Sequence, residues 1–294
     1  MKLVFFGTPP FSASILHHLI ASPFEVVAVV TQPPKPKGRS GKPTPTPVAE
    51  LAQANHLPTF APRRPSEIAD ALRQIGADLF VVAAYGALLK EDLLEMPPMG
   101  CINVHTSLLP KYRGAAPIQR AIMAGEEKTG VTIMHMVREL DAGDMILTAE
   151  VPIPPDATYG EVEEALCEQG KKLLVRAIHD LQKGCAPRLP QDPSQATYAH
   201  KIESDECEID WRRPARELHN LIRGASPRPG AWCWVTLKGK RTRLKVLRTS
   251  LLQGEWMVPC GQGSLSLLEV QLEGKRPLSA KAFLAGHPKE FLQL

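Results

Sequence analysis

Along the first 185 residues, short apolar runs alternate with stretches whose apolar side chains recur at helical spacing. This alternation predicts a doubly wound, mainly parallel β-sheet covered by helices, an α/β fold of the Rossmann-like kind. The predicted strands are Leu3–Phe6, Glu25–Thr31, Asp78–Ala84, one that ends near His105, Val131–Val137 and Ile146–Val151. The predicted helices are Phe11–Ile20, Val48–His56, one that Ser66 caps and that ends at Ile75, one that begins at Pro117, and a long one that begins at a Thr158/Glu161 capping box.

The pattern changes after residue 185. Residues 186–204 are rich in Pro, Gln and Ser and predict a linker. Residues 205–294 contain short strand-like runs separated by glycine turns, which predicts a small β-barrel of the OB-like kind that often binds oligonucleotides. We therefore expect an α/β domain at 1–185, a linker at 186–204 and a basic β-barrel domain at 205–294.

Composition narrows the class of protein. A chain of 294 residues with 44% apolar and 22% charged residues is long enough for two globular domains. No apolar stretch approaches the roughly 20 residues that a membrane-spanning helix needs, so we expect no membrane contact. The six cysteines are scattered without a Cys-x-x-Cys pair, which favours reduced thiols in the cytoplasm.

Polar side chains interrupt one strand that should be buried. Asn103 and His105 share one face of this strand, while Ile102 and Val104 share the other. Ligands of open α/β sheets bind beyond the carboxyl ends of the strands, where these two side chains are expected. Two interpretations remain open at this point. Both side chains either bond to backbone at a strand end or contact a reactant.

Two loops extend this candidate site. Residues 107–110 can lay backbone amides against a flat ligand, and residues 139–144 place Asp141 and Asp144 on either side of a glycine turn. Aspartates in turns often bond only to their own backbone, so a structural role is the alternative for each. The turn Gly7–Pro10 lacks the three spaced glycines of a dinucleotide-binding site and carries two prolines, so it does not favour a nucleotide site.

Basic residues are concentrated in two places. Residues 32–47 form a proline-rich segment without other apolar side chains, so we expect an extended, mobile loop. Residues 205–294 hold 15 Lys and Arg against 9 Asp and Glu, a net charge of +6, whereas residues 1–204 carry −2. Each region is either a solvated basic surface or a contact for nucleic-acid phosphates. The candidate contacts are Lys35, Lys37, Arg39, Lys42, Lys240, Arg241 and Arg243.

The run Asn103–Gln119 reads NVHTSLLPKYRGAAPIQ and resembles the signature of the folate-dependent formyltransferases. Leu140–Gly143 is similar to their Leu-Asp-x-Gly motif, and Pro227–Trp232 and Ser279–Phe283 resemble their C-terminal module. The resemblance implies that Asn103, His105 and Asp141 are catalytic. It also implies that 10-formyltetrahydrofolate binds beside Ser107, Leu108, Leu109, Pro110 and Tyr85, without a metal.

Three features are similar to the family members that act on tRNA: the Gly114–Gln119 continuation, the basic segment around Arg39, and the basic second module. They imply transfer of a formyl group to the α-amine of methionine on initiator Met-tRNA. The expected protein is a cytoplasmic monomer that binds folate and tRNA. Two alternatives remain: a formyltransferase that acts on an amino sugar nucleotide, and a non-catalytic RNA-binding protein.

The chemistry explains why these residue types suffice. An amine that attacks a formyl carbonyl creates a negatively charged oxygen, and each donor aimed at such an oxygen lowers the barrier by roughly 3 to 4 kcal/mol. Asn103 is a neutral donor, and His105 is a stronger one if it is protonated, a state that a nearby Asp141 favours by charge attraction. Because α-amino groups have a pKa of roughly 7.7 to 8, a useful fraction is already unprotonated at neutral pH. No strong base or metal is therefore required.

Overall fold

The computed structural model describes residues 1–36, 41–237, 239–287, 292 and 293. The chain forms two compact units. The first consists of Met1–Arg113, Gly130–Val151 and Glu164–Tyr198, and the second of Gly114–Thr129, Pro152–Glu163 and Ala199–Leu294. The domain boundaries expected at residues 185 and 205 stay a prediction. No helix in the described ranges is both long and apolar enough to cross a membrane.

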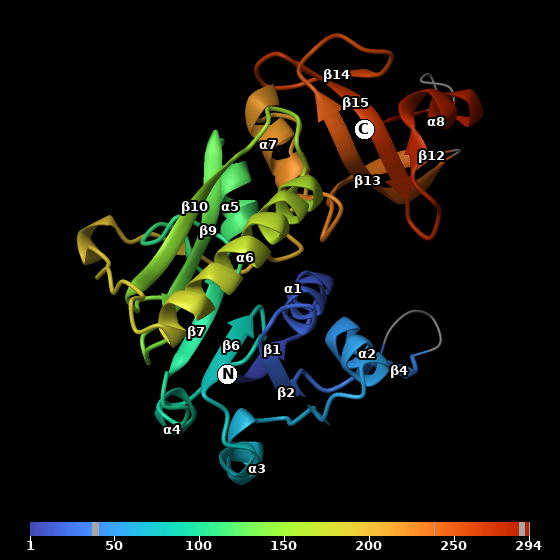
Figure 1. The fold of residues 1–294 in the computed structure, drawn as a ribbon. Coiled ribbons are helices and arrows are strands. Elements are labelled where there is room, and N and C mark those ends of the chain that lie inside the picture. Colours follow the sequence, from blue (N-terminus) through green and yellow to red (C-terminus); the bar gives the residue numbers. More distant parts are fainter. Residues whose placement is uncertain (37–40, 238, 288–291, 294) are drawn as a thin grey trace. The chain divides into compact units, whose positions relative to one another are not determined.

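The first unit is built on a seven-stranded sheet in the order β10-β9-β7-β6-β1-β2-β5 (Figure 1). The neighbours from β7 to β5 are parallel, and β9 is antiparallel to β7. The predicted α/β fold with a mainly parallel sheet is therefore confirmed. The strands are β1 (Lys2–Gly7), β2 (Glu25–Val30), β5 (Thr59–Phe60), β6 (Leu79–Ala83), β7 (Cys101–His105), β9 (Lys128–His135) and β10 (Met145–Pro152).

Helices connect these strands near the predicted positions. They are α1 (Pro10–Ile20), α2 (Pro47–Ala54), α3 (Ala69–Ile75), α4 (Glu91–Leu94) and α6 (Tyr159–Gln182). The predicted cap at Ser66 is wrong. Pro65 begins a 3₁₀ turn, η1 (Pro65–Ile68), that contains Ser66, and α3 follows Ile68 with no side-chain cap. Proline fixes its backbone angle near the helical value, so the turn begins one residue before the serine.

The basic segment at 32–47 has more regular structure than the composition predicts. Two short strands, β3 (Lys35–Pro36) and β4 (Pro43–Thr44), pair antiparallel. These parts of the segment, which we expected to be an extended loop, therefore form a small β-hairpin. Thr46 then caps α2 by accepting a hydrogen bond from the backbone N–H of Ala49. Lys37 and Arg39 lie outside the described residues.

The second unit contains the predicted small β domain. Its antiparallel sheet runs in the order β14-β15-β13-β12-β17, and β16 pairs with β15. The elements are α5 (Pro117–Met123), α7 (Ala215–Ala225), β12 (Ala231–Leu237), β13 (Lys240–Ser250), β14 (Met257–Pro259), β15 (Ser264–Leu272), β16 (Leu278–Ser279), α8 (Ala280–Gly286) and β17 (Leu292–Gln293). The remaining short elements of the chain are β8 (Arg113–Gly114), β11 (Tyr198–Ala199) and η2 (Pro193–Gln195).

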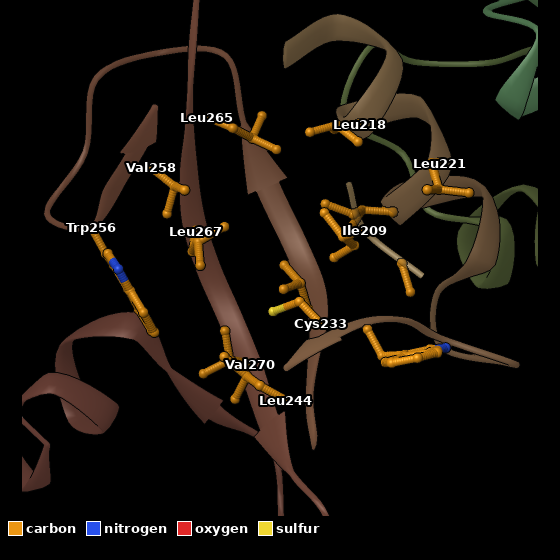
Figure 2. Close-up of a cluster of buried hydrophobic side chains, with 14 of the residues drawn as sticks. Ile209, Leu218, Leu221, Cys233, Leu244, Trp256, Val258, Leu265, Leu267 and Val270 are labelled. Atoms are coloured by element: carbon orange, nitrogen blue, oxygen red, sulfur yellow. The ribbon is translucent and has the colours of Figure 1, made fainter. Parts of the chain in front are cut away.

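One apolar core holds this second unit together (Figure 2). Leu218 and Leu221 of α7 supply one side, and Leu244, Leu265 and Val270 of the sheet supply the other. Burying each such side chain stabilises the fold by about 1.5 to 3 kcal/mol. The inward side chains of β12 and β13 are thereby committed to the core, which leaves the opposite face of this strand pair for other contacts.

The predicted capping box at the start of α6 is confirmed. The Thr158 backbone N–H donates to Glu161 Oε2 at 2.8 Å, and the Glu161 N–H approaches Thr158 Oγ1 at 3.5 Å. We expect Thr158→Ala to lower the free energy of unfolding by about 1 kcal/mol, because a helix-terminal donor loses its acceptor. Chemical denaturation measures the change. Thr158→Ser keeps the hydroxyl and should stay close to the wild type, and an equal loss in both variants would contradict the capping explanation.

A buried histidine makes the stability of the second unit depend on pH. His219 has Nδ1 2.9 Å from Thr249 Oγ1 and Nε2 3.0 Å from the carbonyl oxygen of Pro155. Burial holds the pKa of His219 below its ordinary value. Since the unfolded chain keeps a pKa near 6.5, it binds more protons than the folded chain as the pH falls below about that value.

We therefore expect the free energy of unfolding to be highest above about pH 6.5 and to decrease toward pH 5. Denaturant unfolding at a series of pH values measures this slope. His219→Gln removes the titrating group, and its slope should be shallower than that of the wild type. An unchanged slope in this variant would assign the pH dependence to other groups, such as His135, whose pKa burial also lowers.

Candidate active site

The structure brings two of the three predicted catalytic side chains together at the end of β7. His105 is buried, and its Nε2 lies 3.0 Å from the carbonyl oxygen of Tyr112. A carbonyl oxygen only accepts hydrogen bonds, so Nε2 carries a proton. The other ring nitrogen, Nδ1, lies 3.7 Å from Asp141 Oδ2. The carbonyl of Tyr112 thus fixes the ring so that Nδ1 faces the carboxylate.

Asp141 lies in the turn between β9 and β10 with a backbone φ of 49°. Aspartate tolerates this left-handed conformation better than most residues. A second constraint comes from Gly143, where a Cβ atom would lie 1.9 Å from the carbonyl oxygen of His135. The Leu-Asp-x-Gly pattern therefore has a steric basis, because only glycine allows this close approach of the two backbones.

Asn103 is the third residue of the predicted trio. It is half-buried in β7, opposite Val82 of β6 and Met134 of β9. Asn103 and His105 are two positions apart on one strand and therefore share a face, at a spacing of roughly 6.5 to 7 Å. Within the described residues, the side-chain amide of Asn103 has no hydrogen-bond partner, which leaves its N–H groups available to a ligand.

The loop after β7 is held by its own hydrogen bonds. Ser107 Oγ donates to the carbonyl of Lys111 at 2.6 Å, and Thr132 Oγ1 donates to the carbonyl of Ser107 at 2.7 Å. Leu109 is buried, its N–H approaches Thr132 Oγ1 at 3.3 Å, and Leu108 packs over Gly130. The predicted ligand contacts at Ser107, Leu108, Leu109 and Pro110 thus lie in a loop of fixed shape. The Ser107 hydroxyl already serves that loop.

Tyr85 follows β6, and its ring is buried edge-to-face against Phe6 at a centroid distance of 5.4 Å. Burial raises the pKa of Tyr85 to about 12. Its hydroxyl oxygen is buried without a partner in the described part of the chain, as is Nε2 of Gln32, which follows β2. Two orphaned polar atoms beyond the carboxyl ends of parallel strands fit a site for a polar ligand.

The predicted basic contacts divide into three groups. Lys35 and Lys42 are exposed near the β3–β4 hairpin, while Lys37 and Arg39 fall outside the described residues. Lys240 and Arg241 are exposed at the start of β13. Arg243 is only half-buried, with its guanidinium carbon 3.7 Å from the ring centroid of Trp232.

Two residues near the site were missed by sequence reasoning. Arg113 and Gln191 are both buried, and Nε and Nη2 of Arg113 donate to Gln191 Oε1 at 3.0 and 2.8 Å. The amide of Gln191 donates in turn to the carbonyls of Asp141 and Gly143, each at 2.8 Å. The network holds the backbone of the Asp141 turn. The sequence carries a signal for Arg113, which lies in the seventeen-residue run, but none for Gln191.

Comparison with known proteins decides the family. Residues 1–178 match the family model described as formyl transferase, and residues 201–288 match its C-terminal domain. A methionyl-tRNA formyltransferase from Protochlamydia amoebophila is 48% identical over 309 residues, which cover 100% of this chain and 97% of that protein. The chain belongs to the methionyl-tRNA formyltransferase family.

Solved structures of other formyltransferase-fold proteins share the architecture of this family member. HypX from Aquifex aeolicus, crystallised with tetrahydrofolic acid, matches with a TM-score of 0.67 at 16% identity over 97% of this chain. The chain spans about half the length of that protein, 47%. An N-formyltransferase from Helicobacter canadensis, in complex with folinic acid and dTDP-3-aminofucose, has a TM-score of 0.67 at 18% identity, covering 91% of this chain and 99% of that one. At such identities the likeness concerns the fold alone.

Proposed function

We propose that this chain transfers the formyl group of 10-formyltetrahydrofolate to the α-amine of methionine on initiator Met-tRNA. The observation that carries the proposal is the cluster at the end of β7. There His105 of β7 and Asp141 of the turn between β9 and β10 lie 3.7 Å apart, and Asn103, two positions before His105, shares the strand face of His105. Membership of the family supports formyl transfer as the reaction that we assign to these three residues.

The proposed formyl donor is 10-formyltetrahydrofolate, which carries the formyl carbon. The loop Ser107–Pro110 and the region around Tyr85 are the proposed folate contacts. The orphaned hydroxyl of Tyr85 and amide of Gln32 support a polar ligand there, because buried polar groups are normally paired. Since the hydroxyl of Ser107 and the N–H of Leu109 are already bonded within the protein, these two groups shape the loop and leave other atoms to touch the ligand.

The three side chains of the cluster have separate roles in this proposal. Asn103 donates a hydrogen bond to the formyl oxygen as negative charge develops on it. His105 presents Nδ1 to the reacting groups, with its ring held by the carbonyl of Tyr112. Asp141 lies beside Nδ1, stabilises positive charge that develops on the imidazole, and accepts the proton that the attacking amine loses, directly or through water. The bond between the formyl carbon and N10 of the folate then breaks, and this proton passes to N10 of the departing tetrahydrofolate. The mechanism uses no metal.

The proposed acceptor is recognised through phosphate contacts. Lys35, Lys37, Arg39 and Lys42 of the basic segment and Lys240, Arg241 and Arg243 of the second unit are the proposed tRNA contacts. Exposed Lys and Arg side chains at both places support this role, because their binding to RNA phosphates releases condensed counterions, and this release favours association. We further propose that the protein acts in the cytoplasm as a monomer.

An amino sugar nucleotide is the alternative acceptor. The fold alone does not identify the acceptor, because the Helicobacter canadensis structure with dTDP-3-aminofucose matches this chain as well as the HypX structure does. The net charge of +6 on residues 205–294 favours the polyanionic acceptor. So does the 48% identity to a methionyl-tRNA formyltransferase along the full chain.

The test offers 10-formyltetrahydrofolate with three acceptors in parallel: initiator Met-tRNA, free methionine and a dTDP-amino sugar. The proposal expects transfer to initiator Met-tRNA and none to free methionine or to the sugar. Formylation of the sugar would move the function to the alternative. Tight tRNA binding without transfer to any acceptor would leave a non-catalytic RNA-binding protein.

A further inference from the structure

Tryptophan and basic side chains share the outer face of the β12–β13 strand pair. The two strands lie side by side (Figure 1), and residues directly opposite each other in such a pair project to the same face. The neighbouring positions Cys233 and Leu244 project to the opposite face and join the apolar core (Figure 2). The opposed outer pairs are Trp232 with Lys245, Trp234 with Arg243, and Thr236 with Arg241.

These side chains form a continuous series of contacts. The guanidinium carbon of Arg241 lies 4.4 Å from the ring centroid of Trp234. That of Arg243 lies 3.7 Å from Trp232 and 5.9 Å from Trp234. The two indoles meet edge-to-face at 5.7 Å. All three guanidinium contacts fall within the roughly 6 Å over which a cation is attracted to an aromatic face. We call this set of four side chains the Trp-Arg ribbon.

Exposure separates Trp234 from Trp232, its buried neighbour in the Trp-Arg ribbon, and from Trp256 of the core. Trp232 is 6% exposed and Trp256 is 3% exposed, with Trp256 stacked on Phe283. Trp234 is 38% exposed on the outer face. Large aromatic side chains are enriched in surfaces that bind partners, so the exposed indole of Trp234 beside Arg241 is a candidate contact for a partner.

Charge separates the ribbon from the rest of β13. Arg248, farther along the strand, lies 2.6 Å from Glu161 and 3.8 Å from Glu269. Lys245 donates to the carbonyl of Pro229. Arg241 and Arg243, in contrast, have no carboxylate partner among the residues that the structure describes. The positive charge of the ribbon is therefore uncompensated, and a polyanion is the complementary partner.

We propose that the Trp-Arg ribbon is an RNA contact, in which Arg241 binds a phosphate and the indole of Trp234 stacks on a base. Aromatic side chains interleaved with cations are the arrangement that binds RNA through base stacking and backbone charge together. An acidic peptide would use the charge but leave the exposed indole without a partner. Stacking on Trp234 also holds the guanidinium of Arg241 flat, so less side-chain freedom is lost when a phosphate binds.

This inference rests on the proposed function in one respect, which is that the RNA is the tRNA acceptor. The test measures the dissociation constant of Met-tRNA over a range of KCl concentrations for Trp234→Ala, Arg241→Gln and the matched control Arg248→Gln. Trp234→Ala should bind about tenfold more weakly, with the salt slope unchanged. Arg241→Gln should bind more weakly and reduce the slope by about one. Arg248→Gln should stay within about twofold of the wild type, because its carboxylate partners already occupy it.

Kinetics keep the two proposals separable. If the wild type formylates Met-tRNA, Trp234→Ala should raise KM for tRNA about tenfold and leave kcat at saturating tRNA unchanged. Wild-type affinity and KM in both Trp234→Ala and Arg241→Gln would overturn the ribbon and leave the proposed function intact. A wild type that transfers no formyl group, but whose tRNA binding weakens in both variants, would support the ribbon alone.

Two further arms guard against misreading. Trp234→Phe keeps a smaller stacking face, so its dissociation constant for Met-tRNA should lie between those of the wild type and Trp234→Ala. If the alanine variant does not fold, Trp234→Phe and Arg241→Gln together still test the proposal. Thermal unfolding of each variant gives that check. Polyglutamate is the probe for a general anion surface. Binding of polyglutamate as tight as that of tRNA, with equal loss in Trp234→Ala, would overturn the assignment to RNA.

Discussion

We expect His105→Asn to lower kcat for formyl transfer by about two to three orders of magnitude, while Met-tRNA should bind nearly as tightly as to the wild type. The substitution removes the ring whose Nε2 donates to the carbonyl of Tyr112 and whose Nδ1 faces Asp141. Loss of one preorganised group at a developing oxyanion typically reduces kcat by about 10² to 10³-fold. Rapid-quench assays at saturating Met-tRNA and 10-formyltetrahydrofolate measure kcat, and fluorescence anisotropy measures tRNA affinity.

Asp141→Asn is the companion variant. It keeps the size of the side chain but removes the charge beside His105 Nδ1, so kcat should fall by a similar factor. Asp144→Asn is the matched control in the same loop, because it also removes one carboxylate charge, but one whose nearest basic partner is the exposed Arg188 at 3.8 Å. Equal losses in the Asp141 and Asp144 variants, or a large loss of tRNA affinity in either, would contradict the proposed roles.

Gln191→Glu should lower kcat by about 10 to 100-fold with little change in KM. The glutamate still accepts hydrogen bonds from the buried guanidinium of Arg113, but it replaces an N–H donor by an oxygen that faces the carbonyls of Asp141 and Gly143. The turn then loses the bonds that hold it. A misplacement of a reacting group by about 1 Å can reduce a rate about 100-fold.

Gln191→Leu separates positioning from folding. It removes the acceptor as well and leaves the charge of Arg113 buried without a partner, so it should lower the free energy of unfolding by about 3 kcal/mol or more. Denaturant unfolding and steady-state kinetics on both variants test the assignment. A Glu variant with wild-type kcat would show that Gln191 supports the fold without positioning Asp141.

The periodicity of apolar side chains predicts most of the fold. Runs such as Asp78–Ala84 are apolar because both faces of a parallel strand are covered, and the structure places β6 there. The capping signal fails where a neighbouring residue has a stronger conformational preference. At Ser66 the preceding Pro65 begins the 3₁₀ turn one residue earlier, so the serine lies inside the turn. The hairpin of β3 and β4 was missed because its strands are two residues long and proline-rich, so no periodicity can develop.

The residues of the candidate site could be predicted where the signal lies in one short stretch of sequence. Asn103 and His105 stand out because they are polar in a buried strand, and Asp141 stands out through its motif. Gln191 could not be found in this way, because it lies in irregular chain 50 residues from Asp141 and its role exists only through the folded contact. The same holds for Trp234 and Arg241, whose stacking depends on the register of two strands.

The most direct test of the central claim measures tetrahydrofolate and formyl-methionyl-tRNA together in one reaction with initiator Met-tRNA. The account predicts equal amounts of the two products, formed only when Met-tRNA is present, and loss of both in His105→Asn. Tetrahydrofolate and free formate released at the same rate without Met-tRNA would contradict it, because the cluster at the end of β7 would then serve hydrolysis rather than transfer to an amine.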